Sequence, residues 1–234
     1  MKRTVIILVL LTSFASFAQA QFSQFHVGGA FPTSKFGDGD AGSDRLPGSD
    51  KGFAKTGFTV GFKYYGPLQV ENLSWVFALQ GFYNGLNSDV KDYIEESNFE
   101  DITLSKYLNF PATVGANYAF PVTETVKIYG EAGIGANFSM PTKTSRKNHS
   151  TYADDEYKIT PMFAFAYGLE AGLFINGKYS LGVRYNNLGS YKYKYEYHAE
   201  GYEVDKRKYS RALPITIVSL CVGVLISPTK EKKQ

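Results

Sequence analysis

Strict alternation of apolar and polar residues, repeated along most of the chain, is the feature that most restricts its fold. The clearest example covers residues 108–120, where every even position is apolar or aromatic and the odd positions include Asn109, Thr113 and Asn117. Successive side chains of a β-strand point to opposite faces, so a period of two predicts a strand with two chemically different sides. A helix with this pattern would carry both kinds of residue on every side.

Seven further segments follow the same rule, with Val76 and Phe82 as exceptions, so eight strands are expected. They cover residues 25–31, 58–64, 75–83, 108–120, 126–138, 163–175, 179–185 and 218–226. The last apolar stretch, residues 213–226, is shorter than a membrane-spanning helix, is rich in β-branched residues and contains Pro214. It is therefore also expected to be a strand.

The connections between these segments alternate in length. The long ones cover residues 32–55, 84–106, 140–159 and 188–210, and the short ones cover residues 66–72, 121–125 and 176–177. The pair Asn176-Gly177 is typical of a type I′ hairpin turn. Long loops on one side and short turns on the other are the arrangement of outer-membrane barrels.

The composition of the two strand faces indicates which one points inward. One face carries the large apolar residues, and the other is rich in Gly, Ala, Ser, Thr and Asn. Small and polar residues fit the narrow interior of an eight-stranded barrel, whereas large apolar ones fit a band that meets lipid. A soluble ligand-binding barrel of lipocalin type would need bulky apolar residues inside. The expected fold is all-β: an eight-stranded antiparallel up-and-down transmembrane β-barrel.

The first twenty residues are expected to be a cleaved signal peptide. Lys2 and Arg3 precede an apolar stretch, and Ala18-Gln19-Ala20 has the small-residue pattern of a cleavage site. The unbroken apolar run, residues 5–11, is far shorter than the ~20 residues that span a bilayer. The expected organisation is a signal peptide over residues 1–20, a barrel domain over 21–227 and a short polar periplasmic tail over 228–234.

Charge and cysteine content exclude several classes of protein. Loss of Lys2 and Arg3 lowers the formal net charge from +3 to +1, which leaves no clustered basic face for nucleic acid. Cys221 is the one cysteine in the sequence, so an intramolecular disulfide and a cysteine-based metal cluster are both excluded.

Four glycine-rich stretches carry a resemblance to a known family. They are residues 28–33 (GGAFPT), 129–135 (YGEAGIG), 167–172 (YGLEAG) and 180–185 (SLGVRY). The mature chain resembles small porin-like outer-membrane β-barrels of the OmpA/OmpX type. The resemblance implies outer-membrane location, periplasmic termini, extracellular long loops, contact with outer-membrane lipid, and handling by the barrel-assembly machinery. Such barrels often end on an aromatic residue, whereas this chain continues past Ile226 into polar residues.

Ionisable and amide residues on the inward face are expected to form a polar network. They are Lys63, Gln80, Lys127, Glu131, Glu170 and Arg184. Counted from the short turns, Glu131, Glu170 and Arg184 lie at similar depth on three consecutive strands. Isolated buried charges are costly, so these side chains should pair and hydrogen-bond. The network is interpreted as a structural plug, and the alternative is a gate in a narrow porin-like channel for small solutes.

Catalytic, metal and cofactor sites are not expected. The three histidines are His26 in the first strand, His149 in the third loop and His198 in the fourth, and no nucleophile–base–orienter set can be assembled around them. A rim-site lipid-modifying enzyme is the remaining enzymatic alternative. The second loop is acidic but lacks the spacing of a calcium loop.

The fourth loop begins with alternating tyrosines at Tyr191, Tyr193, Tyr195 and Tyr197. They continue the alternation of the seventh strand, so strands seven and eight should extend above the membrane as a hairpin. The tyrosines would either pair across strands and stiffen the hairpin, or form a binding edge for an extracellular ligand that the sequence does not identify. The expected function is an integral outer-membrane β-barrel protein with a structural or surface-interaction role.

Overall fold

The structure is a computed structural model. It describes the backbone of residues 22–37, 51–87, 100–103, 106–140, 144–148, 153–159, 162–199 and 210–227. The expected signal peptide, the tail over residues 228–234 and His149 lie outside these residues. Across the described ranges, no helix has both the length and the apolar character needed to cross a membrane.

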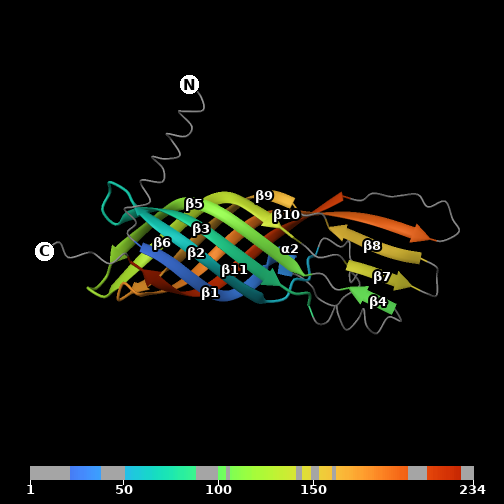
Figure 1. Cartoon of the computed structure of the whole chain (residues 1–234), viewed down its shortest axis with the longest axis horizontal. Coiled ribbons are helices and arrows are strands. Elements are labelled where there is room, and N and C mark those ends of the chain that lie inside the picture. The colour runs from blue at the N-terminus through green and yellow to red at the C-terminus, as the bar shows by residue number, and fades with distance from the viewer. Residues whose placement is uncertain are drawn as a thin grey trace, which may run out of the picture.

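Within the described residues, eight long antiparallel strands close into a barrel. They are β1 (Phe22–Thr33), β2 (Gly57–Pro67), β3 (Leu73–Asn84), β5 (Tyr107–Pro121), β6 (Val126–Ser139), β9 (Met162–Ile175), β10 (Tyr179–Ala199) and β11 (Ser210–Ile226). Each pairs with the next in chain order, and β11 pairs back onto β1 with Ile226 opposite Ser23 (Figure 1). The expected eight-stranded up-and-down barrel is confirmed.

Short turns join the strands at one end of the barrel, here called the turn end. In the β9–β10 turn, Asn176 and Gly177 both have positive φ, 53° and 61°, as a type I′ turn requires. The amide of Lys178 donates to the carbonyl of Ile175 at 3.0 Å and closes this turn. Strand β1 begins and β11 ends at the turn end, and the long connections leave from the opposite, loop end (Figure 1).

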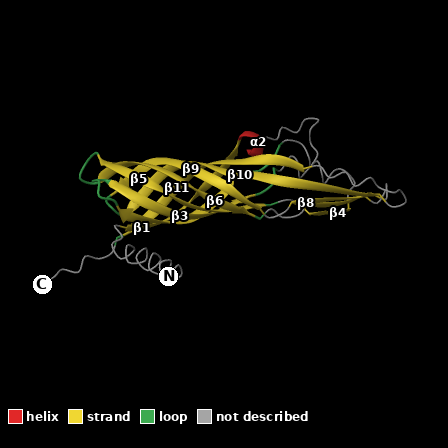
Figure 2. Cartoon of the chain, turned by 90° about the horizontal axis from the view of Figure 1, so that it is seen from above, coloured by secondary structure: helices red, strands yellow, loops and turns green. Residues whose placement is uncertain are grey.

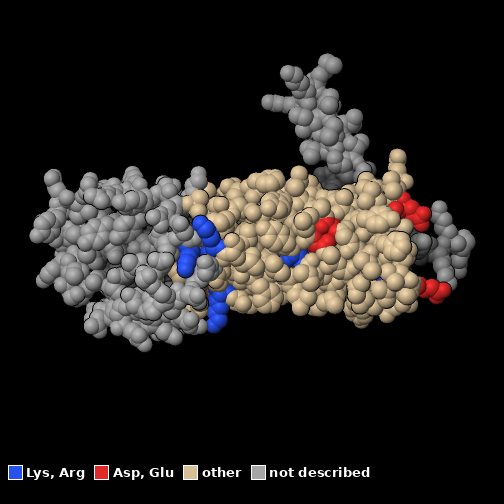
Figure 3. All heavy atoms as spheres, turned by 180° about the vertical axis from the view of Figure 1, so that it is seen from behind, with Lys and Arg blue, Asp and Glu red and all other residues tan. Residues whose placement is uncertain are grey.

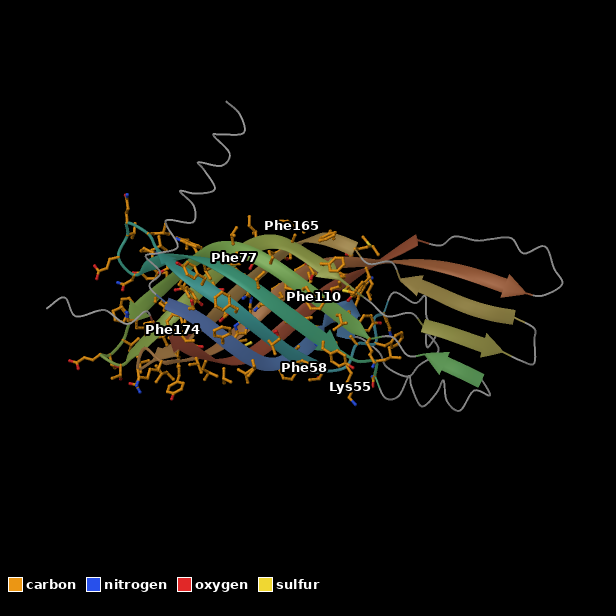
Figure 4. The ribbon with its side chains drawn as sticks, in the orientation of Figure 1. Lys55, Phe58, Phe77, Phe110, Phe165 and Phe174 are labelled. Carbon is orange, nitrogen blue, oxygen red and sulfur yellow. The ribbon has the colours of Figure 1, made fainter. Side chains whose placement is uncertain are left out.

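Burial alternates along the strands and confirms the expected orientation of the two faces. Phe163 is 76% exposed on the outer wall, whereas Lys63, a charged residue, is 1% exposed inside. Apolar side chains project from the wall, Phe58 and Phe165 among them (Figure 4). The wall in Figure 3 is almost uncharged apart from one small spot, and its other visible charges gather at the two ends. An apolar band of this kind suits acyl chains.

Beyond the loop end, the sheet continues past the closed barrel. β10 pairs with β11 as far as Lys194 and with β8 (Ala153–Ile159) from Tyr193 to Ala199. β7 (Thr144–Asn148) and β4 (Glu100–Thr103) extend this sheet (Figures 1 and 2). The expected hairpin of strands seven and eight is present as far as the Lys194–Ser210 pair, and further out β10 pairs with β8 instead.

Strands β4, β7 and β8 and the short helix α2 (Ser34–Gly37) lie in segments that the sequence indicated as loops. The three strands lack alternation of large apolar with small residues, and they lie beyond the wall of the closed barrel. Their order depends on the edge that β10 offers, which is a nonlocal feature of the fold.

Candidate functional site

Four charged side chains meet in the middle of the barrel and are here called the ionic layer: Lys63, Glu131, Glu170 and Arg184. The register places Glu170 directly opposite Glu131 on β6 and directly opposite Arg184 on β10. Lys63 enters from β2, across the lumen. All four residues are buried, and their formal charges cancel.

The ammonium of Lys63 is the closest link between the two carboxylates. Its Nζ lies 2.6 Å from Glu170 Oε2 and 3.1 Å from each oxygen of Glu131. Arg184 Nη1 lies 3.5 Å from one oxygen of each carboxylate, and Arg184 Nε donates to Asn186 Oδ1 at 3.0 Å. The two cations therefore neutralise two carboxylates that would otherwise repel each other at close range.

Tyrosine hydroxyls supply further hydrogen bonds to the ionic layer. Tyr129 donates to Glu170 Oε1 at 2.5 Å, and Tyr65 lies 3.0 Å from Glu131 Oε2 and 2.7 Å from Gln24 Oε1. Gln24 in turn donates to Ser180 Oγ at 2.6 Å. Buried charges are tolerated when such hydrogen bonds accompany the ion pair. Tyr65 is not among the residues predicted from the sequence, although its position two residues after Lys63 places it on the inward face.

The remaining two predicted members of the polar network lie elsewhere. Gln80 is buried inside the barrel with its Nε2 3.1 Å from His26 Nε2. Lys127 shares a face of β6 with Glu131 but is exposed at the turn end, where it lines an open hollow beside Asn117. The assignment of Lys127 to the interior network is therefore wrong, because it lies four residues closer to the turn, where the barrel opens.

Aromatic rings fill the lumen on the turn side of the ionic layer. Phe22 stacks on Tyr65 with ring centroids 4.3 Å apart, and Tyr129 stacks on Phe174 at 4.1 Å. Phe174 also meets Phe22 and Tyr65 edge to face. These four residues are here called the turn-side aromatic layer. Tyr65 and Tyr129 connect the two layers, because their rings pack among the aromatic residues and their hydroxyls point toward the carboxylates of the ionic layer.

A second group of rings lies on the loop side of the barrel. Phe36 of α2, Tyr107 and Tyr191 have ring centroids 5.1 to 6.2 Å apart and are here called the loop-side aromatic layer. Tyr107 donates to the carbonyl of Gly52 at 2.7 Å, and Tyr191 donates to Asn109 Oδ1 at 3.2 Å. The expected plug of polar side chains therefore describes only part of the lumen, because apolar and aromatic groups fill both sides of its charged centre.

The assignment of Tyr191 to a surface binding edge is wrong, because this residue is 0% exposed. A register shift between Asn187 and Ser190 interrupts the alternation of β10. Up to Leu188 the even-numbered residues face inward, and after the shift the odd-numbered Tyr191 does. One extra residue in a strand reverses the faces beyond it. The side chains of Tyr193, Tyr195 and Tyr197 lie outside those that the structure describes.

The residues able to bind a metal ion in proteins of this composition are His, Cys, Asp and Glu. In the part of the chain that the structure describes, no group of three or more such residues is placed to hold an ion. Cys221 is buried as a free thiol, and only the backbone of His198 is described. The described interior is thus a neutralised set of ion pairs between two aromatic layers.

This barrel is similar to known outer-membrane proteins in both sequence and structure. The model of the outer membrane protein β-barrel domain matches residues 4–209. OprG from Pseudomonas aeruginosa is similar in structure, with 12% identity, coverage of 90% of this chain and 98% of that one, and a TM-score of 0.52. Neisserial surface protein A has 15% identity, coverage of 88% and 96%, and a TM-score of 0.48. No curated protein sequence matches the chain.

Proposed function

The chain belongs to the outer-membrane β-barrel protein family, and on that premise we propose that it is a non-enzymatic membrane barrel with a closed lumen, acting through its loop-end surface. The observation that carries the proposal is the filled interior. A solute moving along the axis would meet the turn-side aromatic layer, the ionic layer and the loop-side aromatic layer in succession.

The turn-side aromatic layer and the ionic layer oppose passage for different physical reasons. At the turn side, the stacked rings of Tyr129 and Phe174 present apolar faces to an ion. In the ionic layer, Lys63 already holds both carboxylates within ion-pair distance, so a permeating cation would have to displace it. Barrels of about eight strands have interiors that side chains can fill. These features favour a closed barrel over the alternative of a narrow channel.

We place the turn end in the periplasm and the loop end outside the cell. The beginning of β1, the end of β11 and the three short turns share one end of the barrel, and the long connections share the other. Outer-membrane barrels have short periplasmic turns and longer extracellular loops. Protease treatment of intact cells tests this orientation, since cleavage should occur within the long connections and spare the turns.

The loop-end sheet supports a surface-interaction role. Strand β10 extends past the barrel, and β8, β7 and β4 continue its sheet outward. In the register, Tyr195 lies opposite Tyr157 and Tyr193 lies opposite Ile159. Function in such scaffolds is usually carried by the connecting segments that the rigid part displays. An extracellular partner would therefore meet this sheet, not the lumen.

Planar-bilayer recordings of the refolded barrel test the closed lumen. The barrel is delivered to the bilayer from lipid vesicles, and its incorporation into those vesicles is verified by heat-dependent mobility on gels and by protease protection. The proposal expects no discrete conductance steps from verified barrels. Reproducible steps that change when Lys63 is replaced by Met, and that do not change with Lys127→Met, would favour the narrow channel instead.

A further inference from the structure

A groove on the outer wall of the barrel runs between two rows of apolar side chains. The row nearer the turn end contains Phe25, Phe62 and Leu79, which are neighbours in the strand register. The row nearer the loop end contains Val27, Val60 and Gly81, again in register. Residues between the rows point inward, so the floor of the groove is the backbone of residues such as Gly61 and Gln80.

The groove is open to the outside, and the row nearer the loop end lacks bulk. Gly81 has no side chain on the outer wall, and its row, with Val27 on β1 and Val60 on β2, lies beside the Phe25–Phe62 ring pair, whose centroids are 5.0 Å apart. Phe110 on β5 closes the groove beyond Gly81, and the volume is about 770 Å³. The exposed side chains that line it are apolar except for the hydroxyl of Tyr179.

The dimensions of the groove suit one hydrocarbon chain. From Tyr179 on β10 to Phe110 on β5 it crosses five inter-strand steps, or about 24 Å along the wall. Strands of these barrels tilt by about 40°, so a line across them rises by about 15 Å, which is half of the ~30 Å hydrocarbon core. The groove therefore has the reach of an acyl chain within a single leaflet.

A polar end distinguishes the groove from plain lipid-facing wall. Tyr179 is the first residue of β10 and lies directly after the β9–β10 turn, with Lys178 exposed beside it. The amide of Leu225 donates to the carbonyl of Lys178 at 2.7 Å, which fixes this turn against the end of β11. A cation and a phenol at the edge of an apolar band are the groups that contact lipid headgroups.

We infer that this groove binds one glycerophospholipid from the leaflet on the turn side. One acyl chain lies between the two rows with its terminal methyl toward Gly81 and Phe110, and the phosphate lies near Lys178 and the hydroxyl of Tyr179. The site is separate from the lumen and from the loop-end sheet, so it does not depend on the function proposed for either.

The binding of a single lipid is measured by native mass spectrometry. Protein purified from membranes and delipidated in detergent is titrated with palmitoyl-oleoyl-phosphatidylglycerol. Gly81→Leu fills the groove, and a Cβ at this position meets Phe110 and Val60 at ordinary distances of 3.7 and 3.8 Å. Gly130→Leu is the matched control, since Gly130 is exposed on β6 and a Cβ there meets nothing within 4 Å.

Wild-type protein and Gly130→Leu should retain one lipid per chain with equal affinity. Gly81→Leu should bind about tenfold more weakly, the loss expected when roughly two methylene groups of the acyl chain are no longer buried. Equal retention by all three proteins would overturn the proposal.

A second pair of variants tests the position proposed for the lipid phosphate. Lys178→Glu should weaken retention of phosphatidylglycerol, whereas Lys127→Glu, an exposed lysine at the same end of the barrel, should not. Equal effects of the two substitutions would overturn the placement of the phosphate at Lys178.

A third measurement needs no variant and so does not depend on refolding of Gly81→Leu. A phosphatidylglycerol with a diazirine near the terminal carbon of one chain should label the wild-type barrel mainly on β2, β3 and β5. Labelling spread evenly over all eight barrel strands would overturn the site.

Discussion

Glu131 and Glu170 lie directly opposite each other on β6 and β9, so two carboxylates share one buried register position. Like charges placed directly across a strand pair destabilise a sheet unless cations compensate them. Lys63 reaches across the lumen from β2 to within 3.1 Å of both carboxylates. The contact links opposite walls of the barrel, so it should stabilise barrel closure as well as the carboxylate pair.

Replacing Lys63 by Met should be the most damaging substitution in the ionic layer. It leaves Glu131 and Glu170 facing each other with Arg184 as the nearest remaining cation, and breaking a buried pair in this way costs about 3–5 kcal/mol. Urea-dependent folding in lipid vesicles, followed by gel mobility, measures the change. Lys127→Met is the control, and as a surface substitution it should change stability by no more than about 0.5 kcal/mol. Equal losses would contradict the role given to Lys63.

Adding Glu170→Gln to Lys63→Met should restore part of the lost stability, because it removes one of the two carboxylates that the substitution left uncompensated. Contacting residues in one ion-pair network typically show coupling of about 0.5–3 kcal/mol. The double-mutant cycle is measured by the same unfolding assay. Additive losses would show that Lys63 and Glu170 do not interact energetically, despite their 2.6 Å separation.

Arg184→Ala should lower stability less than Lys63→Met does. Arg184 Nη1 lies 3.5 Å from each carboxylate, which is at the long limit of a hydrogen bond, while the Lys63 contacts are 2.6 and 3.1 Å. A loss of about 3 kcal/mol, the lower end for a broken buried pair, is expected. Thermal unfolding of the two variants side by side gives the order. A larger loss for Arg184→Ala would mean that Arg184 is the principal counter-ion.

Phe174→Ala and Phe165→Ala should differ strongly although both remove a ring from β9. Phe174 is buried against Tyr129 inside the barrel, and its loss leaves a cavity, at a typical cost of about 3–5 kcal/mol for Phe→Ala. Phe165 is 64% exposed on the outer wall (Figure 4), where lipid fills the vacated space. Unfolding in vesicles should therefore show a clearly smaller loss for Phe165→Ala, and similar losses would contradict the assignment of the two faces.

Alternation in the sequence was sufficient to predict the eight barrel strands and, up to the bulge in β10, the facing of their side chains. It also placed Glu131, Glu170 and Arg184 at a common depth, because depth follows from counting residues from short turns. The contact of Lys63 with these residues could not be obtained in this way. It crosses the lumen between strands that are not neighbours, and its distance depends on the diameter of the closed barrel.

Three other features could not be predicted from the alternation. Lys127 has the correct parity, but parity does not show where the barrel opens at the turn end. Strand β8 has mostly charged and aromatic residues and depends on β10 for pairing. The bulge in β10 involves a single additional residue near Gly189. Asn187, Leu188 and Gly189 interrupt the alternation there, but the interruption alone does not show on which face Tyr191 lies.

Replacing Gly189 by Ala should test whether the bulge at this glycine causes the inward and outward faces of β10 to exchange. Gly189 has φ of +83°, and a Cβ there would lie 2.3 Å from Ala164 Cβ, so an added methyl group meets both backbone strain and a clash. Strained positions of this kind cost about 1–3 kcal/mol each, and the clash adds to this. Because the bulge turns Tyr191 inward, its distortion should also loosen the contact of Tyr191 with Phe36 and Tyr107.

Unfolding in vesicles measures the loss of stability, and accessibility of Tyr191 to iodination measures its exposure. Gly130→Ala should change neither quantity appreciably, since a Cβ there meets nothing within 4 Å. If Gly189→Ala leaves Tyr191 protected and stability unchanged, the bulge does not depend on glycine and the burial of Tyr191 needs another cause.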